Sequence, residues 1–300
     1  MNDYVRKMIL VIDESGAKGY SSNREAEAGE LGVMAGFIYH DFELEPLERI
    51  LDSRLAPFRA IGGKLHVSEL SPKRQHELRE IIYDMFRQTR IRWIYSAAYV
   101  QGFHEALSSA KRAESLHEKL FQDILAHALA RAHQIGVTDL NLEVRTDHVD
   151  SGVLKRFEGI SDLLKDLLLR KERKYKKKPY SNDGASPGPA HELALKIEGK
   201  NLIRFNSISI EINASTSALT VAADILANSV LHNLRGKQGK QLGIALNQRG
   251  ALSGHPLEKQ ALVSEEGELY SALDLLYGRN PQPERLSEQF GTASGIPPES

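Results

Sequence analysis

The sequence predicts an α/β fold, built on one central mixed β-sheet of about five strands flanked by helices. Short apolar or alternating stretches, typical of strands, recur between residues 5 and 212. Most of them are separated by amphipathic stretches with apolar residues three and four positions apart, which is typical of helices. With 41% hydrophobic and 26% charged residues in 300, the composition is also that of a globular protein.

The predicted strands differ in the burial that their sequences indicate. Residues 5–12 are a continuous apolar run, which favours a central strand buried on both faces. Residues 31–39 follow closely enough to pair with it as a hairpin across the polar loop 17–30. The remaining strands are predicted at residues 91–100, 140–147 and 208–212.

Five helices are predicted from the spacing of apolar residues, at residues 42–58, 71–88, 116–132, 153–174 and 218–234. Ser71 followed by Pro72 is typical of an N-cap and a first turn. Gly136 ends the third helix, and either Ser215 or Ser217 caps the last one.

Residues 1–235 are predicted to form one domain, with a basic, flexible insertion at about residues 170–190. Residues 236–300 form a C-terminal extension whose proline-containing end we expect to be disordered. No cysteine is present, which excludes disulfides, thiolate nucleophiles and Cys-ligated metal sites. The N-terminal apolar stretch is too short for a signal peptide, and no stretch is long enough for a membrane span. We therefore expect a cytoplasmic protein without membrane contact.

Three acidic side chains are predicted at strand ends or at a helix entrance. Asp13, in the motif Ile-Asp-Glu-Ser-Gly, follows the first strand, where open α/β sheets place their ligands; the alternative is a simple turn. Glu69 precedes the second helix together with His66, and alternatively only favours the positive end of that helix. Asp147 ends the fourth strand; alternatively, Asp150 or Ser151 only caps the next helix and Asp147 lies in the loop.

The fourth predicted strand has one polar side. Alternation puts Asp147 on the side of Glu143 and Arg145, opposite Leu142 and Val144. That side must therefore face a polar environment or lie near the rim of the sheet.

A fourth acid, Asp224, lies inside a helix whose residues are apolar on nearly every side, which indicates burial. A buried carboxylate without a partner is costly, so it requires a cation, a basic residue or a proton. Asn228 and His232 follow at one and two helical turns and form a polar stripe with it. A structural network with an arginine is the alternative.

Gathered at one place, the four acids would repel one another unless a divalent metal neutralised them. Oxygen ligands favour Mg²⁺ or Mn²⁺ over zinc. Such a site suits phosphoryl transfer, in which one metal lowers the pKa of an attacking water and another stabilises the leaving oxygen. The histidines near these acids, His66, His148 and His232, are candidates for positioning water or for acting as the general base. Secondary candidates for the site are Glu14, Ser15, Asp150, Asn228 and His232.

These motifs resemble a bacterial family numbered 3800 among domains of unknown function. The resemblance rests on Ile-Asp-Glu-Ser-Gly, on Leu-His-x-Ser-Glu some fifty residues later, on an Asp after a later strand, and on a helix with Ala-Asp-Ile-Leu-Ala. It spans about residues 5–235 and implies a ribonuclease H-like fold with metal-dependent nuclease activity, in settings such as phage defence or mobile elements.

The same resemblance implies roles for the four acids. Asp13 would bridge two metal ions, Asp224 would hold the outer one, and Glu69 and Asp147 would complete the site. One feature departs from the pattern, because ribonuclease H places three strands before its first helix and two are predicted here.

Residues 170–178 contain seven basic side chains and one acid, so the formal net charge of −1 for the whole chain conceals a strongly basic segment. The basic residues are Arg170, Lys171, Arg173, Lys174, Lys176, Lys177 and Lys178. They are candidate contacts to a nucleic-acid backbone, with Tyr175 and Tyr180 available to stack on bases. The alternative is a solvated run that satisfies a helix dipole.

The sequence therefore predicts a Mg²⁺- or Mn²⁺-dependent nuclease with a two-metal carboxylate site and a nucleic-acid partner, either DNA or RNA. A partner protein or a homo-oligomer stays open. Two other functions remain: a catalytically silent nucleic-acid-binding or assembly subunit that acts with a partner enzyme, and a hydrolase of free nucleotides or pyrophosphate. The sequence has no Walker phosphate loop and no Gly-x-Ser-x-Gly elbow.

Overall fold

The computed structural model describes residues 6–17, 28–58, 65, 67, 70–106, 116–169, 172–177, 191–196, 203–238, 244–262 and 272–278. The strands are β1 (Arg6–Gly16), β2 (Leu31–His40), β3 (Arg92–Tyr99), β4 (Asp139–Thr146), β5 (Glu172–Lys177), β6 (His191–Lys196) and β7 (Ser207–Ala214). The helices are α1 (Leu44–Leu55), α2 (Pro72–Thr89), α3 (Val100–Ala106), α4 (Leu116–Gln134), α5 (Ser151–Leu169), α6 (Ala218–Gln238) and α7 (Ala272–Leu276).

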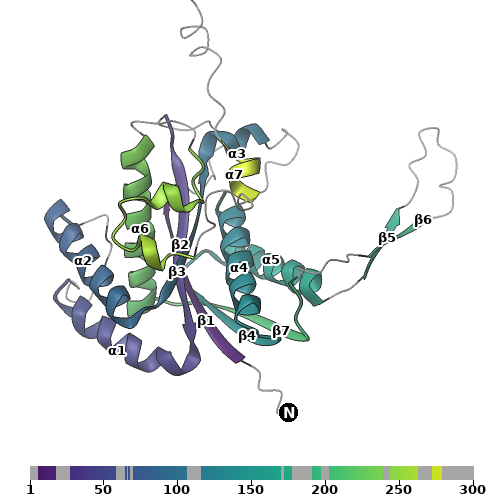
Figure 1. Cartoon of the computed structure of the whole chain (residues 1–300), viewed down its shortest axis with the longest axis horizontal. Coiled ribbons are helices and arrows are strands. Elements are labelled where there is room, and N and C mark those ends of the chain that lie inside the picture. The colour runs from purple at the N-terminus through teal and green to yellow at the C-terminus, as the bar shows by residue number, and fades with distance from the viewer. Residues whose placement is uncertain are drawn as a thin grey trace, which may run out of the picture.

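Five strands form one mixed sheet in the order β3-β2-β1-β4-β7 (Figure 1). β2 is antiparallel to both β1 and β3, whereas β1, β4 and β7 run parallel. The predicted class is confirmed: the protein is α/β, with a central mixed sheet of five strands flanked by helices. The predicted hairpin of the first two strands is also confirmed. α1 and α2 are inserted between β2 and β3, yet β3 still pairs with β2, so the insertion leaves the strand order intact.

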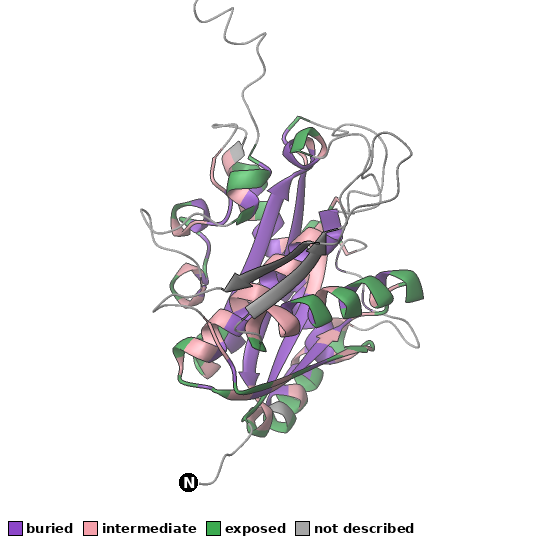
Figure 2. Ribbon diagram, turned by 90° about the vertical axis from the view of Figure 1, so that its right-hand side faces the viewer, coloured by how far each residue is buried: buried purple, intermediate pink, exposed green. Residues whose placement is uncertain are grey.

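The helices cover the two faces of the sheet and create two cores (Figures 1 and 2). On one face α6 packs against β1 and β2, with α1 and α2 outside it. On the other face α4 and α5 pack on the sheet, joined by α3 and α7. Alternate residues of β1 enter the two cores: Ile9 and Val11 face α6, while Leu10 and Ile12 face α4 and α5.

Among the described elements, α6 packs mainly on β1 and β2, and the residues of β4 and β7 on this face of the sheet are polar. Glu143 of β4 accepts hydrogen bonds from Arg145 (2.8 Å) and from Asn213 of β7 (3.0 Å), and it lies 3.5 Å from Lys7 Nζ. The expectation that this side of β4 needs a polar environment is confirmed, because the described helices pack mainly on its opposite side.

Two predicted boundaries are wrong. The predicted turn at Asp13 to Gly16 is part of β1, because antiparallel pairing with β2 continues to the Gly16–Gly32 pair. The backbone turns at Gly16, whose φ of 83° is readily adopted by glycine. The helix predicted to reach Lys174 ends at Leu169, because the following residues pair with β6 as a separate two-stranded sheet.

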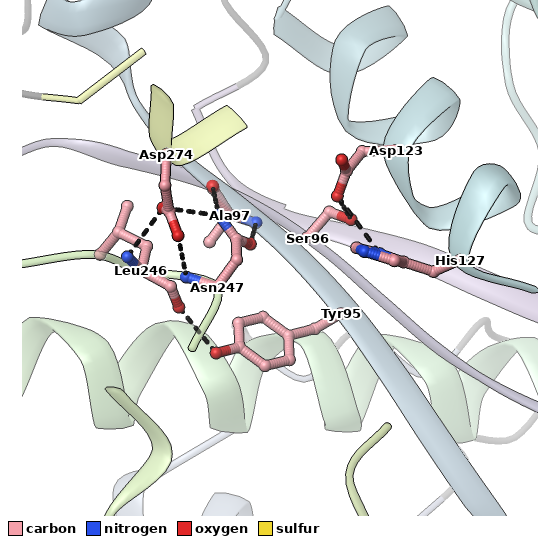
Figure 3. Close-up of polar contacts among 8 residues, drawn as sticks. All are labelled: Tyr95, Ser96, Ala97, Asp123, His127, Leu246, Asn247 and Asp274. Atoms are coloured by element: carbon pink, nitrogen blue, oxygen red, sulfur yellow. Dashed lines mark hydrogen bonds and ion pairs between the residues drawn. The ribbon is translucent and has the colours of Figure 1, made fainter. Parts of the chain in front are cut away.

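A segment after α6 covers the free edge of β3 (Figure 3). The side-chain amide of Asn247 accepts a hydrogen bond from Ala97 N (2.7 Å) and donates one to Ala97 O (2.8 Å), as a neighbouring strand would. Tyr95 Oη donates to Leu246 O (2.7 Å), and the Asp274 carboxylate accepts from the backbone N–H groups of Leu246 and Asn247.

Residues 244–262 also contribute apolar side chains to the core beneath α6, with Leu246, Leu252 and Leu257 fully buried. This segment therefore packs on the domain predicted for residues 1–235, and the boundary at residue 235 stays a prediction. Among the residues described, no helix has the length and hydropathy needed to cross a membrane.

The same segment holds a buried histidine in one tautomer. His255 is 4% exposed, and its Nδ1 accepts a hydrogen bond from Leu257 N (3.2 Å). Its Nε2 therefore carries the hydrogen and donates to Ser229 Oγ (3.1 Å). Burial, and next the charge of Lys237, lower the pKa of His255 from 6.5 to about 4.

This shift predicts an acid-sensitive contribution to stability. Between pH 6.5 and 4, His255 is protonated in the unfolded chain but not in the folded chain. The free energy of unfolding therefore decreases as the pH falls through this range, by about 3 kcal/mol in all. Urea unfolding at pH 7.5, 6 and 4.5 should show the free-energy difference between the parent and His255→Gln shrinking at low pH. A difference that is constant across this range would contradict the assignment.

Candidate functional site

Asp13 lies where β1 runs beyond its parallel neighbour. The β1–β4 pairing ends at Ile12 and Thr146, whereas β1 continues for four residues paired with β2 alone. The side of Asp13 toward β4 is therefore not occupied by a strand. The carboxyl end of the parallel strands opens at this point, as expected of ligand sites in open α/β sheets.

Asp224 of α6 faces Asp13 across the core. The alternation of Ile9 and Val11 places Asp13 on the α6 face of the sheet. Eleven apolar side chains of α6 are buried in the same core, which confirms the predicted burial of this helix, and Asp224 is half-buried among them. The structure thus brings together two of the four predicted acids.

The electrostatics of Asp13 reflect this arrangement. Burial, then the charges of Glu14 and Asp224, raise the pKa of Asp13 from 3.8 to about 9, while the backbone N–H of Glu14, 2.8 Å from Asp13 Oδ1, opposes the rise. At neutral pH the ligand-free site therefore retains a proton. The two charges that contribute to the rise, those of Glu14 and Asp224, are both acidic.

Asp147 occupies the equivalent place on the next strand. Asp13 and Asp147 each follow the last paired residues of adjacent parallel strands, whose backbones lie about 4.8 Å apart. The carboxylate of Asp147 accepts from Thr216 Oγ1 (2.7 Å) and from His148 N (2.8 Å). Asp147 therefore lies near Asp13 at the same edge of the sheet. Thr216, in the loop before α6, holds the side chain of Asp147.

α6 starts with reciprocal capping. Ser217 Oγ accepts from Thr220 N (3.3 Å), and Thr220 Oγ1 accepts from Ser217 N (2.9 Å), so Ser217 rather than Ser215 is the cap. The predicted polar stripe behind this cap becomes more exposed along the helix. Asn228 is half-buried, whereas His232 is exposed to solvent.

An arginine that sequence reasoning missed joins this stripe. Arg79 Nη2 of α2 donates to Asn228 Oδ1 (2.7 Å) and more weakly to Gln75 Oε1 (3.4 Å). The predicted alternative of an arginine network around Asp224 is met only in part, because the arginine contacts Asn228. Nothing in the sequence separates Arg79 from the other charged residues of its helix.

Of the other secondary candidates, Glu14 adjoins Asp13 and helps to raise the pKa of Asp13. Glu14 Oε2 is 3.5 Å from Nε2 of the buried His117, on the α4 side of β1. Ser15 is half-buried in β1, and the exposed Asp150 accepts the first helical hydrogen bond of α5 through its carbonyl oxygen. His148 is exposed.

His66 and Glu69 lie outside the described residues, as do Arg170, Lys171 and Lys178. Arg173, Lys174, Lys176 and Lys177 belong to β5, whose register with β6 pairs Lys174 with Ala194 and Lys176 with Glu192. In the part of the chain that the structure describes, no three acidic or histidine side chains are arranged to hold a metal ion. The described acids therefore supply part of the predicted ligand set, and Glu69 stays a prediction.

A second polar cluster links β3 to α4 (Figure 3). The buried Ser96 donates from Oγ to Asp123 Oδ2 (2.7 Å), and His127 Nδ1 lies 3.4 Å from the same oxygen. Because the carboxylate lies between the hydroxyl and the imidazole, the histidine does not activate the serine as a base would. We therefore assign this cluster to the packing of α4 on the sheet.

Comparison with known proteins adds little to these observations. No protein-family model matches the chain, and no curated protein matches it. Among solved structures, the chain is similar to the crystal structure of ribonuclease H2 from Pyrococcus horikoshii OT3, with a TM-score of 0.36 and 15% identity. The match covers 78% of this chain and 76% of that one. A similarity of this size assigns neither an activity nor a site residue.

Proposed function

We propose that this protein is a Mg²⁺- or Mn²⁺-dependent nuclease that hydrolyses phosphodiester bonds. The observation that carries the proposal is the pair Asp13 and Asp224, two half-buried carboxylates near the carboxyl end of the central strand, close enough for the charge of Asp224 to raise the pKa of Asp13. Two neighbouring acids of which one retains a proton are expected where a cation can replace that proton.

The donor set fits a hard divalent cation. Carboxylate oxygens are the ligands that Mg²⁺ and Mn²⁺ prefer, and cysteine is absent from the chain. Asp13 and Asp224 would hold the ion, with Asp147 able to turn from Thr216 toward it, and Glu69 is proposed as the fourth acid on the resemblance described above. When bound, the cation supplies a Lewis acid and a water of lowered pKa.

The chain's own residues contribute position and charge. Asp13, fixed through Glu14 N, is the acid that must lose its proton when a cation binds. Asp13 and Asp224 are both half-buried, which limits access of bulk water. His66 is proposed as a general base.

Nucleic acid is the proposed substrate because β5 is strongly basic. Four of its six residues are arginine or lysine, and the strand pairs only with β6 among the described elements. Figure 1 shows this hairpin beyond the end of α5, away from the five-stranded sheet. A basic ribbon of this kind suits contact with a phosphate backbone outside the site itself.

The test is a cleavage assay with the purified chain and labelled single- and double-stranded DNA and RNA, with Mn²⁺, Mg²⁺ or chelator. We expect cleavage of one class that requires the divalent ion and disappears in Asp224→Asn. Asp84→Asn, an exposed acid on α2 that belongs to neither site, is the control and should cleave like the parent. Equal activity of the parent and Asp224→Asn would overturn the proposal.

A catalytically silent nucleic-acid-binding subunit is the second candidate, and the basic strand β5 favours it. In that case no divalent ion produces cleavage, whereas binding is salt-sensitive and weakens in Lys174→Gln with Lys176→Gln and Lys177→Gln. Cleavage by the parent protein would exclude this candidate.

A further inference from the structure

We infer that Arg79 forms an anion site beside the acid pair and binds a phosphate oxygen of the substrate. The position of the site follows from contacts of Arg79, and the identity of the anion as a phosphodiester rests on the proposed function. A phosphate could belong to a polynucleotide or to a free nucleotide, and both would present the same oxygens to this arginine.

The guanidinium is held by neutral groups. Asn228 Oδ1 accepts from Arg79 Nη2 at 2.7 Å, and Gln75 Oε1 lies 3.4 Å from the same nitrogen. Gln75 is fixed in turn, because its Nε2 donates to Leu70 O at 2.9 Å. Two side-chain amides, one on α2 and one on α6, thus orient the side chain of Arg79. Because both amides are neutral, they do not neutralise its positive charge.

Among the described residues, no carboxylate forms a salt bridge with Arg79, whereas Arg145, a half-buried arginine of β4, has such a partner in Glu143. Arg79 Nε is buried without a hydrogen-bond acceptor among the described residues. A half-buried arginine arranged in this way has donors and charge to offer an oxyanion.

The location suits a substrate phosphate. Asn228 follows Asp224 by four residues on α6, so the two lie on the same face of the helix about 6 Å apart along its axis. Asp224 in turn lies close enough to Asp13 to raise its pKa. The guanidinium is therefore about one helical turn from the acids, where it would attract a polyanion that the carboxylates alone repel.

A planar guanidinium also explains why arginine would be required here. It can keep its bond to Asn228 through Nη2 while Nη1 donates to a phosphate oxygen, whereas a lysine ammonium offers one compact charge. Asn228 acts as a positioning residue, since it touches the arginine and not the anion.

The experiment measures binding in chelator, so that it does not depend on cleavage. Arg79→Gln, Arg79→Lys and the control Arg87→Gln are titrated with a fluorescein-labelled oligonucleotide at several salt concentrations. Arg87 lies two turns further along α2, exposed and paired with Asp84 at 2.7 Å. Unlabelled ATP and inorganic phosphate serve as competitors, which separates an internucleotide phosphate from a free nucleotide phosphate.

We expect Arg79→Gln to bind the oligonucleotide about 10- to 100-fold more weakly, with the slope of log affinity against log salt reduced by about one. Arg79→Lys should keep the slope and lose part of the affinity, and Arg87→Gln should match the parent. If Arg79→Gln does not fold, the affinity of Arg79→Lys decides.

Parent-like affinity and salt slope in Arg79→Gln, or in Arg79→Lys if that variant decides, would overturn the inference. Failure of the proposed function looks different: the parent would cleave no substrate, while the binding comparison would still be decisive. Where the parent cleaves, Arg79→Gln should also raise KM more than it lowers kcat, because the arginine binds the substrate rather than the leaving oxygen.

Discussion

Replacing Asp13 with asparagine should abolish metal-dependent cleavage and at the same time stabilise the ligand-free protein. Asparagine has nearly the same shape, and its side-chain oxygen can still accept from Glu14 N. It carries no charge, so it cannot serve as the anionic ligand, and we expect activity to fall by at least about a thousand-fold.

The stability gain follows from the raised pKa of Asp13. Between pH 4 and 9 the unfolded chain has lost this proton and the folded chain retains it, so stability falls as the pH rises through that window. At pH 7 Asp13→Asn should therefore be roughly 2–4 kcal/mol more stable without divalent ions. The gain should be absent at pH 3.5, where both states of the parent are protonated.

Calorimetry and thermal unfolding check both effects. Mn²⁺ should bind the parent at pH 7 with release of about one proton and raise its Tm, and it should do neither in Asp13→Asn. Asp84→Asn, an exposed acid on α2, is the control for removal of one negative charge. Cleavage by Asp13→Asn at the parent rate would refute the assigned role of Asp13.

Replacing Asn247 with alanine should destabilise the protein by about 3 kcal/mol or more, since two buried backbone groups of Ala97 lose their partner. The substitution also removes the hydrogen bond from Asn247 Nδ2 to Asp274 Oδ1 (2.8 Å), which links α7 to residues 244–262. The uncovered edge of β3 is then available for pairing between molecules.

Urea unfolding measures the free-energy change, and gel filtration over a range of protein concentration detects association. Asn206→Ala is the matched control, because Asn206 is exposed and its hydrogen bond to Asp139 is long, at 3.3 Å. Its effect should stay within about 0.5 kcal/mol. Similar effects of the two substitutions would mean that Asn247 contributes no more than a surface residue.

The sheet could be predicted from the sequence because its strands carry local signals. The apolar run before Asp13 indicated the central strand, and the alternation at residues 208–212 indicated β7. The all-round apolar character of residues 218–234 likewise predicted the burial that keeps Asp224 beside Asp13. Asp13 and Asp224 could be predicted as site residues because each lies in a segment whose own sequence indicates burial.

The features that the sequence did not predict depend on contacts between distant segments. Asp-Glu-Ser-Gly has the composition of a turn, and only its pairing with residues 32–35 makes it a strand. The basic residues after Leu169 have good helix propensity, and pairing with β6 overrides it. Arg79 and Asn228 are 149 positions apart, and no local pattern links an arginine on one amphipathic helix to an amide on another.

The polar side of β4 has a consequence for how faithfully the chain folds. A shift of β4 by one residue along β1 would turn Glu143 and Arg145 toward α4 and α5, and Leu142 and Val144 toward water. Arg145 would then lose solvent, and the buried Glu143 would lose its contacts with Asn213 and Lys7. The polar side of β4 thus penalises every misaligned pairing, and so keeps Asp147 level with Asp13 in each molecule that folds.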